Sequence, residues 1–421
     1  EFYKFDNFAD ALIFCHSGEG NIWIWNHTAV TYNNTDQTAT AAVLLSTLTS
    51  VGAASVPIDN TAVLITPERH IMVLGAGGNQ RKVNWAAAES YNFLPTNTNT
   101  AGGFELQTKG RIVGGFKTRY GVLIFTTSDV WKTNYVGSPF VYTAERLTEG
   151  GGPVGMKAIA GSTDFVVWMS RGKFYSFNAG YVEELECDVG DFVFSDINMD
   201  IEGLIAAGHN AEHSEVIFYY PKEGDEVNTR YVVYNYLEKH WTTGELQRTQ
   251  CESADALGFV VWAGADGFLY RHEMDPDTQS TPLPRDTAIV APADIDALST
   301  IDKRTVAKGV SAVTFPNIAN ENHLCFAETG SIETGDGSLM SVNQIITDTE
   351  NIGSNGLRMK VTIQNTPDGP ATTKGPFLLE SDGYTDCRFT SRQSQLRIEA
   401  PFDQQFRFGE IRFNGSSGGQ R

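Results

Sequence analysis

Residues 110–135, GRIVGGFKTRYGVLIFTTSDVWKTNY, constrain the fold most, because they hold three short apolar runs separated by turn residues and leave no room for a helix. The runs predict strands at residues 112–116, 122–125 and 130–135. The middle run is apolar at every position, which indicates burial on both faces, whereas the last alternates as a strand with one wet face does. The stretch therefore predicts an antiparallel meander that lies between other sheets.

The same strand-turn-strand unit recurs along the chain, and successive copies begin roughly 50 residues apart. This is the period of a β-propeller built from four-stranded blades. We therefore expect residues 1–274 to form a β-propeller with six visible blades, or seven if further strands complete the ring; a pair of stacked β-sandwiches is the alternative. The copies lie at residues 11–25, 71–85, 110–135, 165–177, 216–236 and 259–270.

Aromatic residues mark the second strand of most of these hairpins. With 41 glycines, 25 phenylalanines, 15 tyrosines and 7 tryptophans, the composition is that of a turn-rich all-β protein in which large rings fill the space between sheets. We expect a structural role inside the blades for Trp25, Trp85, Trp131, Trp168, Tyr234, Trp241 and Trp262.

One segment has helical periodicity. In residues 195–207, isoleucines and leucines recur at helical spacing after a Ser-Asp start, and Gly208 follows, so we expect a helix of two or three turns. Residues 183–202 around its start carry eight acidic side chains and no lysine or arginine. A cation site is one interpretation of that run, and a solvated rim is the interpretation that such runs favour.

The hairpin pattern stops after His272. Residues 275–304 are rich in proline and lack periodicity, which indicates a linker or an extended arm. Residues 305–421 then contain about seven short strands, enough for one β-sandwich domain. The strands are expected at residues 305–315, 324–329, 339–347, 357–364, 385–389, 395–399 and 406–413.

The C-terminal tail differs in charge from the rest of the chain, since residues 388–421 hold six arginines against three acids. A basic end on an acidic chain suggests a contact with another subunit, although any single arginine is also explained as a wet-face residue of a strand. We expect a joint replacement of Arg392, Arg397 and Arg407 by glutamate to leave the fold intact and to weaken assembly. The candidate contact residues are Arg388, Arg392, Arg397 and Arg407.

Catalytic, metal and cofactor motifs are missing from the sequence, so we expect no enzyme and no cofactor. His209 and His213 flank a turn without a third ligand, and a capped turn explains them better than a metal does. Carboxylates such as Asp191, Asp196 and Asp200 carry little information in an acidic chain. The five cysteines lie far apart, and their odd number indicates reduced thiols and a cytoplasmic site of synthesis.

The formal net charge of −20 argues against a protein that grips nucleic acid electrostatically, although it does not exclude DNA that slides past. The apolar runs are all far shorter than the roughly 20 residues of a membrane helix, so we expect no membrane insertion.

Several segments of the chain resemble tailed-phage tail hub or nozzle proteins, which are also called packaged-DNA stabilisation or head-completion proteins. The resemblance rests on structural stretches such as GHNAEHSEVIFYYP and FRFGEIRFNGSSGGQR rather than on a catalytic motif. That family has further sequence before this N-terminus, so we expect residues upstream. The segments that carry the resemblance are residues 110–142, 208–221, 231–246, 328–348, 388–400 and 406–421.

The resemblance implies a podovirus-like virion protein that is assembled in the host cytoplasm. It would form a six-copy ring below the portal and its adaptor, and the ring would retain the genome and then release it. Expected partners are further copies of the chain, tail adaptor proteins, tail fibres or spikes, and phage DNA that passes without sequence-specific binding. The alternative is a tail-associated propeller that binds or depolymerises glycan through exposed aromatics such as Tyr91, Phe93 and Tyr181.

Overall fold

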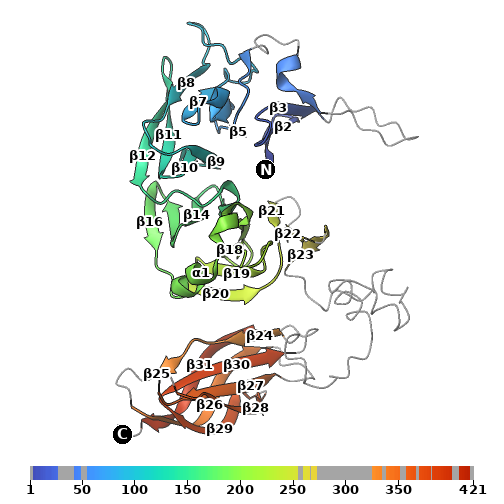
Figure 1. Cartoon of the computed structure of the whole chain (residues 1–421). Helices are drawn as coiled ribbons and strands as arrows, with labels where there is room; N and C mark the ends of the chain where they lie inside the picture. The colour runs from blue at the N-terminus through green and yellow to red at the C-terminus, as the bar shows by residue number, and fades with distance from the viewer. Residues whose placement is uncertain are drawn as a thin grey trace, which may run out of the picture. The chain divides into compact units, whose positions relative to one another are not determined.

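A computed structural model divides the chain into two compact units, Glu1–Glu273 and Met274–Arg421, which are described separately (Figure 1). The expected linker at residues 275–304 and the expected strand at residues 305–315 lie outside the described residues. The structure describes residues 3–26, 42–48, 55–254, 259–265, 267–272, 325–333, 338–350, 357–366, 369–380, 382–400 and 407–417.

The described residues of the N-terminal unit form six antiparallel sheets whose strands follow chain order, here called blades 1 to 6 (Figure 1). Blade 1 contains β1 (Tyr3–Phe8), β2 (Ala11–His16), β3 (Ile22–Asn26) and β4 (Val43–Leu44). Blade 2 contains β5 (Ala62–Ile65), β6 (Ile71–Leu74), β7 (Lys82–Trp85) and β8 (Gly102–Glu105). Blade 3 contains β9 (Ile112–Thr118), β10 (Gly121–Thr126), β11 (Asp129–Gly137) and β12 (Val141–Glu149).

The remaining blades repeat this plan. Blade 4 contains β13 (Ile159–Gly161), β14 (Phe165–Ser170), β15 (Lys173–Asn178) and β16 (Tyr181–Leu185). Blade 5 contains β17 (Ala206–Asn210), β18 (Glu215–Tyr220), β19 (Arg230–Asn235) and β20 (His240–Glu245). Blade 6 has three described strands, β21 (Gln250–Ala254), β22 (Phe259–Ala263) and β23 (Leu269–Arg271). Short 3₁₀ turns lie at Leu45–Thr47, Ala76–Gly78 and Met156–Ala158.

Each blade runs outward from a central first strand. Neighbouring blades meet through their first strands, β1 with β5, β5 with β9, β13 with β17 and β17 with β21. The central strands β5 and β17 are buried along their whole length, whereas the last strands β16 and β20 are largely exposed. Consecutive blades with buried inner strands and wet outer strands define a β-propeller, as the recurring hairpins predicted. The stacked-sandwich alternative for this unit is therefore wrong.

One hydrophobic cluster lies between each pair of consecutive blades. The cluster between blades 1 and 2 joins Ile13 and Ile24 to Val63 and Val73, and equivalent clusters join blades 2 to 3, 3 to 4, 4 to 5 and 5 to 6. Both faces of the interior blades are thus buried, which explains why β6 and β10 are apolar at nearly every position.

The helix expected at residues 195–207 is wrong. Helix α1 spans Gly190–Asp196, Ile197 is already extended, and a separate 3₁₀ turn spans Met199–Leu204. The side chain of Asn198 accepts a hydrogen bond from the Asp200 N–H at 3.1 Å and so caps the start of this turn. Residues after Ile205 enter β17, because an apolar run that is buried on both faces suits a central strand as well as a helix.

The described part of the C-terminal unit consists of two antiparallel sheets. The larger contains β24 (Cys325–Glu328), β25 (Ile332–Glu333), β27 (Arg358–Gln364), β28 (Thr372–Leu378) and β30 (Gln393–Ala400), and the smaller contains β26 (Met340–Glu350), β29 (Tyr384–Ser391) and β31 (Arg407–Ser417). Val342 and Phe389 of the smaller sheet share a buried cluster with Met359 and Leu396 of the larger sheet. This two-layer packing is compatible with the expected β-sandwich, whose class stays a prediction.

Candidate interaction surfaces

The aromatic residues singled out in the sequence lie between or within blades. Trp85, Trp168 and Trp262 are buried in three different inter-blade clusters, and Tyr234 packs on Trp241 with ring centroids 4.6 Å apart. Indole N–H groups donate to backbone carbonyl oxygens, as from Trp168 to Gly151 at 2.6 Å. These rings fill the space between sheets, and the indole N–H groups of Trp85, Trp168 and Trp241 have acceptors, whereas the buried Nε1 of Trp262 has no hydrogen-bond partner.

Trp131 belongs to a buried polar cluster in the turn between β10 and β11. The carboxylate of Asp129 accepts hydrogen bonds from Thr108 Oγ1 at 2.8 Å, Thr126 Oγ1 at 2.5 Å and Trp131 Nε1 at 2.9 Å. Three donors satisfy a buried carboxylate that has little access to water. The cluster fixes the turn, and Asp129 was not recognised from the sequence because Thr108 lies on the preceding loop.

Blades 2 and 3 also meet through a buried tyrosine. Tyr142 OH donates to Glu68 Oε2 at 2.8 Å and lies 2.7 Å from Thr66 Oγ1, and its ring packs edge-on against Trp85. Burial raises the pKa of Tyr142 well above its usual range, with Glu68 adding to the shift. The hydroxyl therefore stays protonated and acts as a structural link.

His209, which was considered as a metal ligand, and Asp196, which was considered for acid-base chemistry, have structural partners. His209 is buried in β17 with Nε2 3.3 Å from Tyr236 OH, and Asp196 Oδ2 lies 2.9 Å from Arg230 Nε in an ion pair that holds α1 on blade 5. Asp191 lies in the first turn of α1, and the backbone N–H of Asp200 donates a hydrogen bond to Asn198 Oδ1. Across the described residues, no cluster of three or more His, Cys, Asp or Glu side chains has the arrangement of a metal site.

Three of the described thiols are not activated nucleophiles. Burial raises the pKa of Cys15, Cys187 and Cys387 to about 11, so each is a neutral thiol near pH 7. This chemistry fits a packing role and gives no sign of covalent catalysis.

Blade 1 has a partly exposed aromatic face in the part of the chain that the structure describes. Its strand register places Tyr3, Phe5, Phe14, Trp23 and Trp25 on the side away from blade 2. Tyr3 is 56% exposed and Phe5 50% exposed, and their rings continue into Phe14 and Trp23 at centroid distances of 5.3 and 6.3 Å. A contiguous exposed apolar patch of this kind marks an interaction surface. Trp25, like Trp131, is half-buried, and it lies on this partly exposed face.

A second apolar surface lies at the tip of the hairpin formed by β11 and β12, where Tyr135, Val136 and Phe140 are exposed. Of the aromatics considered for glycan binding, Phe93 is buried and Tyr91 packs on Phe8 in the cluster between blades 1 and 2. Only Tyr181, which is 78% exposed on β16, is free to contact a ligand.

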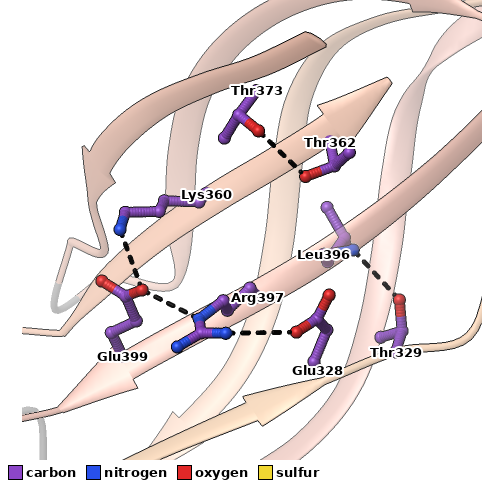
Figure 2. Close-up of polar contacts among 8 residues, drawn as sticks. All are labelled: Glu328, Thr329, Lys360, Thr362, Thr373, Leu396, Arg397 and Glu399. Atoms are coloured by element: carbon purple, nitrogen blue, oxygen red, sulfur yellow. Dashed lines mark hydrogen bonds and ion pairs between the residues drawn. The ribbon is translucent and has the colours of Figure 1, made fainter. Parts of the chain in front are cut away.

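The larger sheet of the C-terminal unit carries a network of four charges on one face (Figure 2). Glu399 is almost fully buried, and its Oε1 lies 3.0 Å from Lys360 Nζ and 2.9 Å from Arg397 Nε. Arg397 Nη1 continues to Glu328 Oε2 at 3.4 Å, and its guanidinium stacks over Phe326 at 3.7 Å from the ring centroid. The network ties β24, β30 and β27 together across their strand register.

This network gives Arg397 a structural role within its own sheet. Its side chain is only 26% exposed and is bound to two carboxylates of its own chain, so a glutamate there would face Glu399 and Glu328. The expectation that a triple replacement including Arg397 spares the fold is therefore not supported. Arg388 is exposed on β29, Arg392 is half-buried, and the side chain of Arg407 lies outside the described ones. A subunit contact through these three stays a prediction.

The C-terminal unit also has an open cleft of about 550 Å³ between β28 and β29. Glu380, Asp382 and Asp386 line it together with apolar residues such as Leu378 and Tyr384, and no lysine or arginine contributes to its lining. The cleft therefore disfavours phosphate and other anionic ligands.

In the described part of the chain, every helix is too short to serve as an apolar membrane span. No protein-family model matches the chain, and no curated protein matches its sequence. The solved structures that are similar include β-propellers from fungi, all at low identity. The WD40 domain of Pan2 from Neurospora crassa is 12% identical over 64% of this chain and 73% of that one, with a TM-score of 0.36.

Prp20p from Saccharomyces cerevisiae is 10% identical over 64% of this chain and 70% of that one, with a TM-score of 0.34. Hsv2p from Kluyveromyces lactis is 11% identical over 68% of this chain and 79% of that one, with a TM-score of 0.35. Similarities this distant carry no information about function.

Proposed function

We propose that the protein is a structural scaffold that assembles with copies of itself, and that the assembly is the hub or nozzle of a phage tail, as the sequence resemblance implies. The observation that supports the scaffold role is the combination, among the described residues, of exposed apolar surfaces with buried charged and phenolic groups that have partners within the chain. Blade 1 exposes an aromatic face, whereas the buried polar groups of Asp129, Tyr142 and Glu399 all have partners within the chain.

Charge supports the conduit part of the proposal. The chain carries a formal net charge of −20, so a ring made of its copies would repel the phosphate backbone of DNA. Weak contact suits a channel through which DNA slides, because tight binding would hold the genome back. The ring would contain six copies and would contact adaptor proteins and fibres or spikes at its ends.

Native mass spectrometry combined with electron microscopy of the purified protein tests the scaffold and conduit together. The expected result is a closed ring of about six copies with an axial hole. A protein that stays monomeric at all concentrations would rule the proposal out.

The glycan-binding alternative keeps one supporting observation, the exposed ring of Tyr181, since aromatic rings stack on sugars. Glycan-array binding that is lost in Tyr181→Ala would favour it. Robust depolymerisation of a glycan by the purified protein, abolished by one substitution, would contradict a purely structural role.

A further inference from the structure

Two neighbouring loops of blades 2 and 3 carry a surplus of positive charge. Residues 79–82 lead into β7, and residues 106–111 connect β8 to β9. Together the two loops hold four cations and no acid, in a chain whose 51 acidic residues outnumber its 31 basic ones. This surface is called the basic patch, and its cations are Arg81, Lys82, Lys109 and Arg111.

Hydrogen bonds hold the two loops side by side. The N–H of Leu106 donates to Arg81 O at 2.9 Å, and the N–H of Ile112 donates to Gln80 O at 2.8 Å. Arg81 Nη1 also donates to Thr108 O at 3.4 Å. The backbone positions of the four cations are therefore fixed relative to one another, so little backbone ordering is needed when a partner binds.

Most of this charge is not neutralised within the chain. Arg81 forms an ion pair with Glu105, whose Oε1 lies 2.8 Å from Arg81 Nη2. Lys82, Lys109 and Arg111 are exposed, and in the part of the chain that the structure describes they form no ion pair. These three cations remain available to an anionic partner.

Two further carboxylates lie near the basic patch without cancelling its charge. Asp129 is 4% exposed and already accepts hydrogen bonds from three side chains of its own cluster. Asp59 is exposed beside the turn, since a Cβ atom at Gly78 would lie 3.8 Å from the Cβ of Asp59. Three unpaired cations against one exposed acid leave the surface positive.

The other side chains of the basic patch suit a phosphate backbone better than a protein surface. Asn79, Gln80 and Gln107 are polar, and Leu106, the apolar residue of these loops, is buried. Protein interfaces are enriched in aromatic residues and depleted of lysine, whereas DNA phosphates are contacted by lysine and arginine together with asparagine and glutamine. The two loops thus offer charge and hydrogen bonds but no apolar anchor.

We propose that the basic patch contacts the phosphate backbone of double-stranded DNA without reading its sequence. This inference rests on the proposed function, in which DNA passes the assembled copies, and it adds the surface that the DNA touches. Three cations neutralise about three phosphates, so the contact is weak and reversible. The acidic remainder of the chain repels the duplex, which confines the contact to this surface and lets the DNA slide.

Matched charge reversals test the surface. Lys109→Glu combined with Arg111→Glu changes the basic patch, and Lys222→Glu combined with Lys239→Glu makes the same change in net charge at exposed lysines of blade 5. All four side chains are exposed, so both double variants should keep the fold and the melting temperature. Fluorescence anisotropy of a short labelled duplex measures binding over a salt series.

The original protein should bind the duplex weakly, and the logarithm of its affinity should fall against the logarithm of salt concentration with a slope of about −3. The variant of the basic patch should bind about tenfold or more weaker, with a slope reduced by about 2, because each lost phosphate contact removes about 1. The blade 5 variant should keep the slope. Equal losses in the two variants overturn the proposal, as does a lack of binding by the original protein at low salt.

Competition identifies the polyanion. Duplex DNA carries one charge per about 1.7 Å of its axis, which is a higher density than an acidic peptide has. Unlabelled DNA of unrelated sequence should therefore displace the labelled duplex, whereas polyglutamate of the same total charge should displace it poorly. Equal displacement by polyglutamate would show that the basic patch takes acidic protein segments, and the DNA assignment would be wrong.

The outcomes separate this inference from the proposed function. If the original protein assembles into a ring and the variant of the basic patch binds DNA as well as the original does, the scaffold function stands and the DNA contact is wrong. If the protein stays a monomer and this variant alone loses DNA binding, the contact stands and the proposed assembly fails.

Discussion

Glu399 is 3% exposed, and its carboxylate forms ion pairs with Arg397 of the same strand and with Lys360 of the neighbouring strand β27. Glu399→Ala removes the anion and leaves Lys360 and Arg397, whose side chains are 16% and 26% exposed, without their main partner. Breaking a buried ion pair on one side costs about 3–5 kcal/mol, and partial exposure of the cations places the expected loss near about 3 kcal/mol. Urea unfolding, monitored by far-ultraviolet circular dichroism, measures this loss in the free energy of unfolding.

A surface pair on the same unit provides the control. Arg412 Nη2 lies 2.7 Å from Glu410 Oε2, yet both side chains are about two-thirds exposed, at 65% and 67%. Glu410→Ala should therefore leave the unfolding midpoint unchanged. Equal losses in the two variants would show that burial does not decide the contribution of these pairs.

His272 makes the stability of blade 6 depend on pH. Burial, together with the nearby Arg248, lowers the pKa of His272 to about 4, below its ordinary value of 6.5. The unfolded chain then binds a proton between about pH 6.5 and 4 that the folded chain does not, so the stability from the neutral imidazole is present above pH 6.5 and is lost as the pH falls toward 4. His272→Gln should flatten the melting temperature across this window, and an unchanged profile would contradict the assignment.

Single side chains were the hardest part to predict from the sequence. The alternation in β30 places Arg397 and Glu399 on one face, but their partners Lys360 and Glu328 belong to strands far away in the chain. Only the register of β24 and β27 brings these charges together. Arg397 therefore looked like a solvated arginine, because burial and long-range pairing leave no local pattern.

At the scale of elements, Gly208 controls how closely blades 5 and 6 pack. A Cβ atom at this position of β17 would lie 2.5 Å from both Cys251 Sγ and Trp262 Cζ2. Both neighbours are buried in the cluster between these blades, so neither can move away easily. Gly208→Ala should destabilise the N-terminal unit by about 1–3 kcal/mol, and hydrogen exchange should show the change first in β17, β21 and β22.

Gly203 offers the matched control, because a Cβ there would meet no atom within 4 Å. Gly203→Ala should be neutral or slightly stabilising. If both alanines have the same effect, close packing at Gly208 is not the reason for its glycine.

The hairpins were predictable because their information is local. Turn residues and apolar runs within about a dozen positions set β2 with β3, β14 with β15, and β22 with β23. The prediction failed near residue 200, where the spacing of the isoleucines suits a helix. The chain instead leaves the helical conformation at Ile197, forms a short 3₁₀ turn and continues as β17. Strand β28 was missed because its Gly375-Pro376 pair signals a turn.

At the scale of the whole molecule, the two units have separate hydrophobic cores, which predicts that they unfold independently. Scanning calorimetry should show Gly208→Ala lowering one transition and Glu399→Ala the other. The double variant should show the sum of the two losses within about 0.5 kcal/mol, since the sites share no partner. A single transition that both substitutions lower would contradict this independence.

The six described blades and their order were predicted from the sequence, which left a seventh blade open, because the repeat period is itself a property of the whole chain. The partial exposure of the aromatic face of blade 1 did not follow, since the alternation of β1 looks the same whether or not a neighbour packs on it. The assembly contacts of the C-terminal unit are equally hidden, because a strand arginine has the same pattern on a wet face and in an interface. Charge-reversing substitutions and a salt series test these contacts.

Arg388 and Arg392 belong to a tail with six arginines and three acids on a chain of net charge −20. If this tail contacts an acidic surface of the neighbouring copy, Arg388→Glu combined with Arg392→Glu turns attraction into repulsion and should weaken assembly by about tenfold or more at low salt. Arg388 is exposed, so Arg388→Glu alone should change the melting temperature of the unit little, whereas Arg392 is half-buried and its single variant is measured beside the pair.

Salt distinguishes this contact from an apolar one, because charges are screened beyond about 10 Å at 0.1 M ionic strength and buried aromatic rings are not. The unsubstituted protein should lose copies as salt rises, and the double glutamate variant should depend on salt much less or in the opposite direction. Native mass spectrometry over a salt series measures both, with Arg388→Gln as the neutral control. Assembly of the double variant with the yield and salt resistance of the unsubstituted protein would show that these arginines make no contact between copies.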